Sequence, residues 1–270
     1  MIGNRKPIGV FDSGIGGLTV MAEVMRVLPC ENLVYFGDTA HVPYGSKSKE
    51  AVTRFSVEIA NFLVSKNVKM IVVACNTASA FALETLRRKF ALPVIGVIEP
   101  GARSAVESTK NKRIGVVGTE GTVQSRSYPA AIAAKNASVK VFSRACPLFV
   151  PLVEEGWLTH DVTRRVAREY VAPLAGKNID TLVLGCTHYP LLKIVLRAAA
   201  GPGIKLIDSA AATADEVART LRKNGRAAPD GTRGKYRFYV SDAPQKFQAA
   251  GRRFLGRAIA GVKKIAMEKY

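Results

Sequence analysis

Short apolar segments alternate along the chain with longer segments of helical periodicity, and this alternation constrains the fold more than any other feature. The strand-like runs and helical segments follow one another at residues 8–11, 16–28, 33–36, 48–65, 70–74, 77–90 and 94–97. Strands that are apolar on both faces are typical of parallel sheets buried between two layers of helices. The first third of the chain therefore predicts an α/β fold.

The pattern then starts again. Residues 113–119 (Arg-Ile-Gly-Val-Val-Gly-Thr) resemble residues 7–13, and residues 182–188 (Leu-Val-Leu-Gly-Cys-Thr-His) resemble residues 71–77. Two matches in the same order indicate a duplicated unit. We therefore expect two similar lobes, each a mostly parallel sheet flanked by helices, related by a pseudo-twofold axis with the active site between them. A helix at 211–223, a strand at 236–240 and a final helix should return to complete the first lobe.

Composition narrows the class of protein but leaves the role of its charge open. The chain has 270 residues, 48% of them hydrophobic, which suffices for well-filled cores and excludes a disordered protein. Its formal net charge is +19. Such charge suits a solvated basic surface, affinity for nucleic acid or another polyanion, or attraction of anionic substrates. No zinc finger or RNP-like aromatic run supports nucleic-acid recognition.

The N-terminal residues and the spacing of the cysteines lead us to expect an intracellular protein. The first residues lead directly into a strand without a secretory apolar region, and no apolar run is long enough to span a bilayer. We expect a cytoplasmic protein without a membrane partner. The cysteines, Cys30, Cys75, Cys146 and Cys186, are far apart and form no CxxC pair, so we predict neither disulfides nor a metal site. Cys30 and Cys146 carry no motif and are predicted to be structural.

The other two cysteines occupy matching positions in the repeat. Cys75 and Cys186 each follow a strand, at the carboxyl edge where parallel sheets bind ligands. If the lobes face one another, the two thiols flank one cleft from opposite sides. That geometry suits inversion of a carbon centre, because one group removes a proton from one face while another donates from the opposite face. Both cysteines precede predicted helices, whose dipoles would favour the thiolate.

The polar residues around these cysteines suit a small zwitterion. Hydroxyl and amide side chains and backbone N–H groups can bind carboxylates without a large charge. The candidates are Ser13, Asn76, Thr77, Thr119, Thr122 and Thr187. Asp12 is predicted to receive an ammonium group or to assist Cys75, and His188 to adjust the reactivity of Cys186.

Other chemistries fit these motifs less well. The loop at residues 12–17 lacks the spacing of a dinucleotide-binding loop, and its aspartate would repel phosphate. Aspartyl phosphoryl transfer would require a second carboxylate where Ser13 stands. A Cys–His protease dyad is disfavoured because Cys186 and His188, two residues apart, are expected to point in different directions. We therefore predict no cofactor.

The chain as a whole resembles the bacterial glutamate racemases. The resemblance is carried by segments at residues 11–19 (FDSGIGGLT), 35–40 (YFGDTA), 43–45 (PYG), 74–79 (ACNTAS) and 184–191 (LGCTHYPL). It implies cofactor-free interconversion of L- and D-glutamate, which supplies D-glutamate for peptidoglycan, by a cytoplasmic enzyme that is usually a homodimer. An aspartate racemase, or another amino-acid racemase of the same superfamily, is the alternative.

The resemblance also implies roles for individual residues. Cys75 would deprotonate D-glutamate with support from Asp12, and Cys186 would deprotonate L-glutamate with support from His188 and Glu154. The substrate would contact Asp12, Ser13, Pro43, Tyr44, Gly45, Asn76, Thr77, Thr187 and His188. The second lobe would span residues 98–207, leaving residues 1–97 and 208–270 to the first. The strong positive charge departs from the family pattern. Some relatives that require a cell-wall precursor as activator carry a longer N-terminal extension, and the resemblance without that extension leads us to expect no such requirement here.

Overall fold

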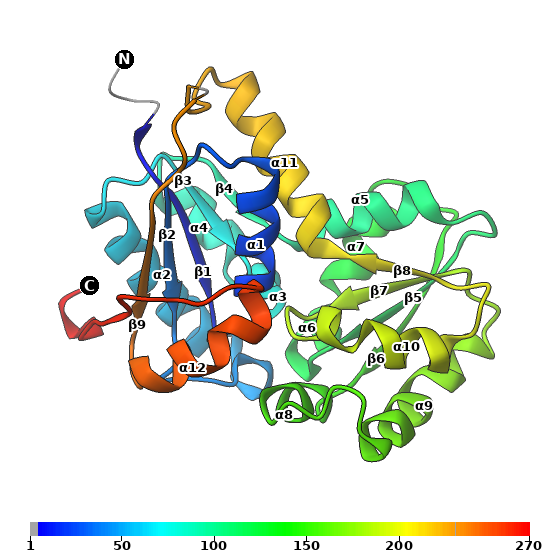
Figure 1. Cartoon of the computed structure of the whole chain (residues 1–270). Helices are drawn as coiled ribbons and strands as arrows, with labels where there is room; N and C mark the ends of the chain where they lie inside the picture. The colour runs from blue at the N-terminus through cyan, green and yellow to red at the C-terminus, as the bar shows by residue number, and fades with distance from the viewer. Residues whose placement is uncertain (1–4, 230) are drawn as a thin grey trace.

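The computed structural model describes residues 5–229 and 231–270 and contains two lobes, each built on its own parallel sheet (Figure 1). The first lobe combines the beginning and the end of the chain. The second is formed by the middle, and α11 (Ser209–Lys223) runs along the boundary between them. Among the described residues, no helix is long and apolar enough to cross a membrane.

The sheet of the first lobe has six strands in the order β10-β9-β2-β1-β3-β4, all pairs parallel. The strands are β1 (Ile8–Asp12), β2 (Leu33–Gly37), β3 (Met70–Val73), β4 (Val94–Gly96), β9 (Tyr236–Val240) and β10 (Lys263–Lys264). β1, β2, β3 and β4 are buried along their whole length. Near its end the chain returns to this sheet, because β9 pairs with β2.

The second sheet has four parallel strands in the order β6-β5-β7-β8. They are β5 (Arg113–Gly118), β6 (Lys140–Ala145), β7 (Thr181–Gly185) and β8 (Lys205–Asp208). This order repeats that of β2-β1-β3-β4 in the first sheet. The motifs that resemble one another in sequence thus form corresponding strands, β1 with β5 and β3 with β7.

Helices cover both faces of each sheet. Around the first sheet, one apolar cluster includes residues of α1 (Leu18–Val27), α11 and α12 (Pro244–Leu255), and another includes residues of α2 (Lys49–Ser65), α3 (Asn76–Phe81) and α4 (Leu83–Lys89). Around the second, α5 (Ile98–Ser108) and α7 (Ser127–Ala133) pack on one face, and α8 (Phe149–Glu154), α9 (Asp161–Ala175) and α10 (Lys193–Ala200) on the other. The remaining elements are short: α6 (Glu120–Gln124) and the 3₁₀ helices η2 (Tyr44–Ser46), η3 (Tyr189–Leu192) and η4 (Met267–Lys269).

Local chemistry explains several helix boundaries. The hydroxyl of Ser48 accepts the N–H of Ala51 at the start of α2, and Asp208 accepts the N–H of Ala210 at the start of α11. The helix predicted over residues 77–90 is interrupted at Ala82. There the carbonyl of Phe81 accepts a hydrogen bond from the hydroxyl of Thr53 on α2, a tertiary contact that the local sequence does not reveal.

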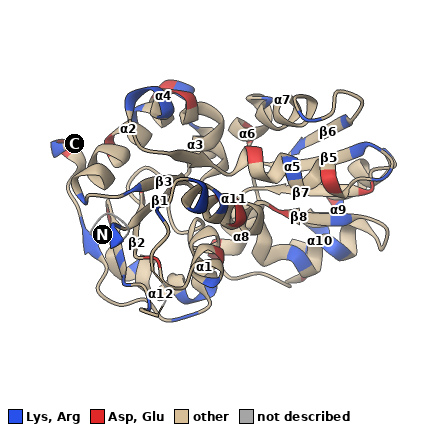
Figure 2. Ribbon diagram, turned by 90° about the horizontal axis from the view of Figure 1, so that it is seen from above, with Lys and Arg blue, Asp and Glu red and all other residues tan. Residues whose placement is uncertain are grey.

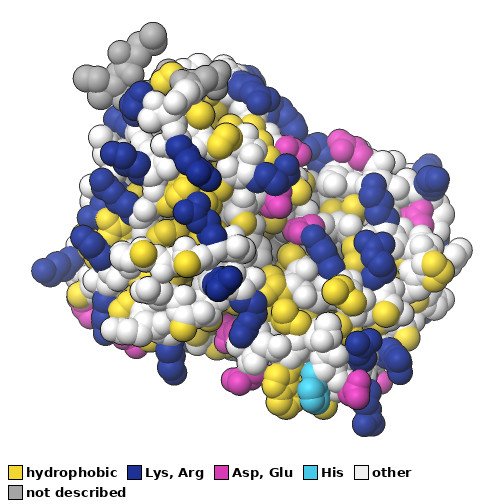
Figure 3. All heavy atoms as spheres, in the orientation of Figure 1, with side chains coloured by type: hydrophobic (Ala, Val, Ile, Leu, Met, Phe, Trp, Pro, Cys, Tyr) yellow, Lys and Arg dark blue, Asp and Glu magenta, His cyan; other side chains and the backbone are white. Residues whose placement is uncertain are grey.

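The distribution of strands between the sheets supports the expected lobes, residues 1–97 with 208–270 and residues 98–207. β4 in the first sheet ends at Gly96, and β8 in the second ends at Asp208. The exact boundaries stay a proposal. Lys and Arg side chains are spread over both lobes and greatly outnumber the acidic ones (Figures 2 and 3).

Candidate active site

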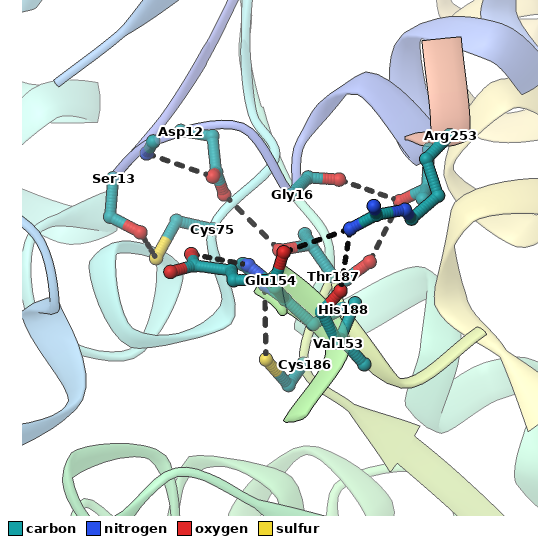
Figure 4. A network of polar contacts seen from close by, with 12 residues as sticks. Asp12, Ser13, Gly16, Cys75, Val153, Glu154, Cys186, Thr187, His188 and Arg253 are labelled. Atoms are coloured by element: carbon teal, nitrogen blue, oxygen red, sulfur yellow. Dashed lines mark hydrogen bonds and ion pairs between the residues drawn. The ribbon is translucent and has the colours of Figure 1, made fainter. Parts of the chain in front are cut away.

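Cys75 lies at the carboxyl end of β3 and caps α3. Its Sγ accepts the N–H of Ala78 at 3.5 Å and lies 3.7 Å from the hydroxyl of Ser13, which follows β1 (Figure 4). Burial raises the pKa of Cys75 to about 12, and the negative charge of Asp12 adds to this effect. The hydrogen bonds from Ala78 and Ser13 oppose the shift without cancelling it. Cys75 is therefore a thiol at neutral pH.

Asp12, the last residue of β1, is fully buried between the lobes. One carboxylate oxygen accepts the N–H of Gly14 at 3.0 Å, and the other accepts the hydroxyl of Thr187 in the second lobe at 3.4 Å. Burial raises the pKa of Asp12, against the positive charge of His188 and the hydrogen bonds of Gly17, Gly14 and Thr187. Asp12 thus joins the first lobe to the loop that carries the second cysteine.

Cys186 lies directly beyond β7 and belongs to a chain of three groups. The Nδ1 of His188 lies 3.9 Å from Cys186 Sγ, and the Nε2 lies 3.0 Å from a carboxylate oxygen of Glu154, at the end of α8 (Figure 4). Burial lowers the pKa of His188, but the hydrogen bonds and negative charges of Cys186 and Glu154 outweigh it and raise the pKa to about 10. His188 is therefore an imidazolium at neutral pH, and its charge stabilises negative charge on Cys186 Sγ.

Both cysteines line one narrow cavity between the lobes, with a volume of about 30 Å³. Its walls come from the ends of β1, β3 and β7, from the loop after β2, and from the second lobe. The lining residues are Ser13, Val42, Pro43, Tyr44, Gly45, Cys75, Asn76, Thr77, Thr119, Val150, Cys186, Thr187 and His188.

Neutral hydrogen-bonding groups connect the lobes on one side of this cavity. The hydroxyl of Thr77 lies 2.8 Å from that of Thr119 and 3.3 Å from that of Thr122, and Thr119 donates to Thr122 at 2.9 Å. Beside them, the carbonyl oxygen of Asn76 accepts the hydroxyl of Tyr128 at 2.8 Å. The amide nitrogen of Asn76 is buried and has no hydrogen-bond partner among the described residues. A buried donor of this kind suits an anionic ligand, because leaving it unpaired is costly.

The loop after β2 forms another wall of the cavity. The hydroxyl of Tyr44 donates to Asp38 at 2.5 Å, and Asp38 also accepts the hydroxyl of Ser241, which follows β9. Pro43 follows a cis peptide bond. At Gly45 an added Cβ would lie 2.7 Å from the Cβ of Thr119, so only glycine permits this close approach of the loop to the second lobe.

The structure brings together almost all of the residues predicted from the sequence. Asp12, Thr122 and Glu154 do not line the cavity but lie behind it, each bonded to a residue that does: Thr187, Thr119 and His188 respectively. The side-chain oxygen that reaches His188 belongs to Glu154 rather than to the adjacent Glu155.

Three predictions about the two cysteines need correction. The helix start was expected to favour the thiolate at Cys75. The N–H of Ala78 does lower the pKa of this thiol, but burial and the negative charge of Asp12 outweigh it. Cys186 does not cap an α-helix, because it is followed by η3, and α10 begins only at Lys193. His188 was expected to point away from Cys186, yet the turn formed by these residues directs its ring toward the sulfur.

Sequence reasoning missed several neighbours of the site. Val42 and Val150 supply apolar wall, and no motif marks them. Arg253, near the end of α12, donates to the backbone carbonyls of Val153 and Glu154, and Phe254 packs its ring edge against His188. In residues 5–229 and 231–270, no group of three or more His, Cys, Asp or Glu side chains is arranged to hold a metal ion.

Comparisons with known proteins agree on one family. Residues 13–217 match the model of the Asp/Glu/Hydantoin racemase family. A glutamate racemase of Geobacter metallireducens is 53% identical over 263 residues, which cover 97% of each chain. The crystal structure of a glutamate racemase from Bacillus anthracis is similar with a TM-score of 0.94 at 41% identity, covering 97% of this chain and 98% of that one. That of the Francisella tularensis glutamate racemase in complex with D-glutamate has a TM-score of 0.92 at 38% identity, covering 99% and 100%.

Proposed function

Because this chain belongs to the Asp/Glu/hydantoin racemase family, we propose that it interconverts L- and D-glutamate by proton transfer between the α-carbon and two cysteines, without a cofactor. Relatives named as glutamate racemases match the chain over nearly its full length. The observation that carries the two-cysteine mechanism is the position of Cys75 and Cys186. They lie at corresponding strand ends of the two lobes and line the same cavity.

In this mechanism one sulfur is a thiolate and the other a thiol when the substrate binds. The thiolate removes the α-proton, and the C–H electron pair remains on the α-carbon as a carbanion conjugated with the carboxylate. The thiol on the opposite face then donates its proton to that carbon. After one turnover the two sulfurs have exchanged protonation states, so the reverse reaction starts from the state that the forward reaction leaves.

The surroundings of the two sulfurs suit opposite starting states. Cys75 carries its proton at neutral pH, whereas Cys186 faces the positively charged His188. We assign Cys186 as the base toward L-glutamate and Cys75 as the base toward D-glutamate, as the family resemblance implies. Asp12 would act on Cys75, or on the substrate ammonium group, through its negative charge.

Neutral donors would bind the carboxylates of the substrate. The hydroxyls of Ser13, Thr77 and Thr187 line the cavity, together with the unpaired amide nitrogen of Asn76. Among the described residues that line the cavity, none is Lys or Arg. Neutral donors add no further charge to those of Asp12 and His188 beside the two sulfurs, while hydrogen bonds to the carboxylates still become stronger as negative charge develops in the transition state.

A substrate comparison tests the choice of glutamate. The purified protein is incubated with L-glutamate or L-aspartate without added cofactor, and the optical rotation is followed. Glutamate should lose its rotation with the higher kcat/KM. A higher kcat/KM for aspartate would move the proposal to the alternative substrate, and no loss of rotation with either would refute racemisation of both.

The proposal extends to the cellular role that the resemblance implies. The enzyme would be a cytoplasmic homodimer that supplies D-glutamate for peptidoglycan synthesis. Growth of a depleted strain that is restored by external D-glutamate would support the metabolic part. Sedimentation of the purified chain tests the dimer, because a single species of monomer mass at micromolar concentration would contradict it.

A secondary affinity for nucleic acid is a further candidate, favoured by one surface feature. At the amino ends of β2 and β9, away from the cavity, two neighbouring hollows are lined by five cations and, among the described residues, by no acid. The cations are Arg5, Lys66, Arg233, Lys235 and Arg237. A gel-shift titration tests this affinity. Binding that persists at physiological salt would support it, and binding confined to low salt would show only nonspecific attraction.

A further inference from the structure

The last helix of the first lobe reaches across to the proton-transfer groups of the second. Arg253, in the final turn of α12, donates from one guanidinium nitrogen to the carbonyl of Val153 at 3.0 Å and to that of Glu154 at 2.8 Å (Figure 4). These are the last two residues of α8. Carbonyls at the end of a helix lack partners in the next turn and carry partial negative charge, so a guanidinium there both completes hydrogen bonds and complements the helix dipole.

The contact is built into the local sequence. Gly156 follows α8 with φ of +82°, and a Cβ at this position would lie 2.8 Å from the second terminal nitrogen of Arg253. Glycine therefore both permits the left-handed turn and leaves room for the guanidinium. Next to Arg253, the ring of Phe254 packs edge-on against His188, with centroids 5.3 Å apart. Two consecutive residues of α12 thus contact the two partners of the hydrogen bond between His188 and Glu154. Arg253 contacts Glu154, and Phe254 contacts His188.

The side chain of Glu154 makes few contacts besides the hydrogen bond with His188. Its side chain is 40% exposed, and its described hydrogen bond is the one with His188. The position of its carboxylate therefore depends on where the end of α8 lies, and Arg253 fixes that end from the other lobe.

We propose that Arg253 is a positioning residue for the Cys186 half of the reaction, holding the end of α8 so that Glu154 stays bonded to His188 and His188 stays directed at Cys186. The proposal rests on the two-cysteine function proposed above. It assigns no contact between Arg253 and the substrate. It requires that loss of the guanidinium weakens one of the two proton transfers and leaves the one at Cys75 intact.

The kinetic test must separate the two transfers. Because the equilibrium constant of a racemisation is unity, kcat/KM has to be equal in both directions for every variant, and a ratio of kcat/KM values reveals nothing. Isotope effects do not have this restriction. If proton transfer at Cys186 slows, the primary isotope effect on α-deuterated L-glutamate rises, because C–H cleavage at Cys186 becomes more limiting. The effect on α-deuterated D-glutamate falls, because delivery of a proton from Cys186 becomes limiting after cleavage.

Arg253→Gln is compared with Arg252→Gln, a change at the exposed neighbour on the same helix. We expect kcat to fall about tenfold in Arg253→Gln, the low end of the loss seen for residues that orient metal ligands, and the two isotope effects to shift in opposite directions. Arg253→Lys, which keeps a donor, should recover part of the loss. Equal isotope effects in wild type and Arg253→Gln, or shifts of the same sign for both enantiomers, would overturn the proposal.

A readout that needs no racemase activity keeps this inference separate from the proposed function. The rate of iodoacetamide alkylation is measured at Cys186 and Cys75 by peptide mass spectrometry as a function of pH. In Arg253→Gln the alkylation profile of Cys186 should differ from that of wild type, because His188 is no longer held beside the sulfur, while the profile of Cys75 stays the same. Unchanged profiles at both cysteines, in a variant that melts like wild type, would refute the positioning role even if the protein proved not to racemise glutamate.

Discussion

The two lobes share one strand order and place a cysteine at the same strand end, yet they surround these cysteines with opposite charge. The strand registers make Ser13 equivalent to Thr119 and Cys75 equivalent to Cys186. Around this common frame the charged residues differ. Asp12 on β1 corresponds to Gly118 on β5, and Thr77 after β3 corresponds to His188 after β7. The first lobe thus has a carboxylate beside its thiol, and the second has an imidazole.

This difference is what a reaction with two thiols requires. Burial by itself would leave both sulfurs protonated, since it disfavours the charged form. The negative Asp12 strengthens that tendency at Cys75, whereas the group beside Cys186 is the positively charged His188. Duplication accounts for the symmetric placement of the thiols, and a few substitutions within the repeat account for the asymmetry of their charge.

Removal of either thiol should have the largest effect. Cys75→Ala and Cys186→Ala should each lower racemisation by about 10³-fold or more in both directions, because general acid–base groups contribute on that scale. Cys30→Ser, at a half-exposed cysteine outside the cavity, serves as control and should keep full activity. Polarimetry with each enantiomer measures the rates. Substantial activity in either alanine variant would show that the lobes do not both take part.

Loss of the positive charge on His188 should have the second-largest effect on activity. The activity of the wild-type enzyme should fall as pH rises through about 10, where His188 loses its proton. His188→Asn should lose about 10²-fold at neutral pH.

The same charge affects stability. Since the folded pKa lies above the ordinary value of 6.5, the charged His188 contributes stability that is fully present below pH 6.5 and lost as pH rises through about 10. Thermal unfolding of wild type and His188→Asn should therefore differ most at low pH and converge above pH 10. A difference that does not depend on pH would contradict the assignment of charge.

Glu154 should have an intermediate effect. Glu154→Gln removes a negative charge that raises the pKa of His188, so the alkaline limb of the pH profile should move to lower pH. The rate at neutral pH should fall about tenfold. The matched control is Glu155→Gln, one residue further along the chain and exposed. If both variants behave alike in a pH–rate profile, the hydrogen bond to His188 is not what supports the second thiol.

The contact between the lobes at Gly45 should give the smallest effect. In Gly45→Ala the added methyl would press on Thr119 and displace the loop that closes the cavity. KM for glutamate should rise severalfold with a smaller change in kcat. Gly203→Ala is the control, since a Cβ there has no neighbour within 4 Å. Equal KM values for the two variants would show that the loop tolerates the displacement.

Much of this arrangement could be predicted from the sequence because it follows from periodicity and repetition. Strand runs such as Met70–Val73 are apolar on both faces, and the two cysteine motifs repeat at similar spacing. Position in the repeat was therefore sufficient to place both thiols at one cavity.

The remainder depends on tertiary contacts that leave no local signal. Arg253 is one of many basic residues in the chain, and its role arises from carbonyls about a hundred positions away. The state of Cys75 could not be predicted from the helix that follows it, because the decisive quantities are burial and the distance to Asp12. The direction of the His188 ring depends on the turn after β7 and on Glu154 from another helix.

The mechanism with two thiols on opposite faces is tested most directly by measuring deuterium incorporation at the α-carbon early in the reaction in D2O. Each enantiomer of glutamate is incubated with the enzyme, and the reaction is stopped after a small fraction has been converted. Separated substrate and product are then analysed for deuterium at the α-carbon. Two distinct thiols predict product that carries deuterium and residual substrate that keeps its hydrogen, in both directions. Product that retains the substrate's own hydrogen, or residual substrate that gains deuterium as fast as product forms, would indicate a single base and contradict the account.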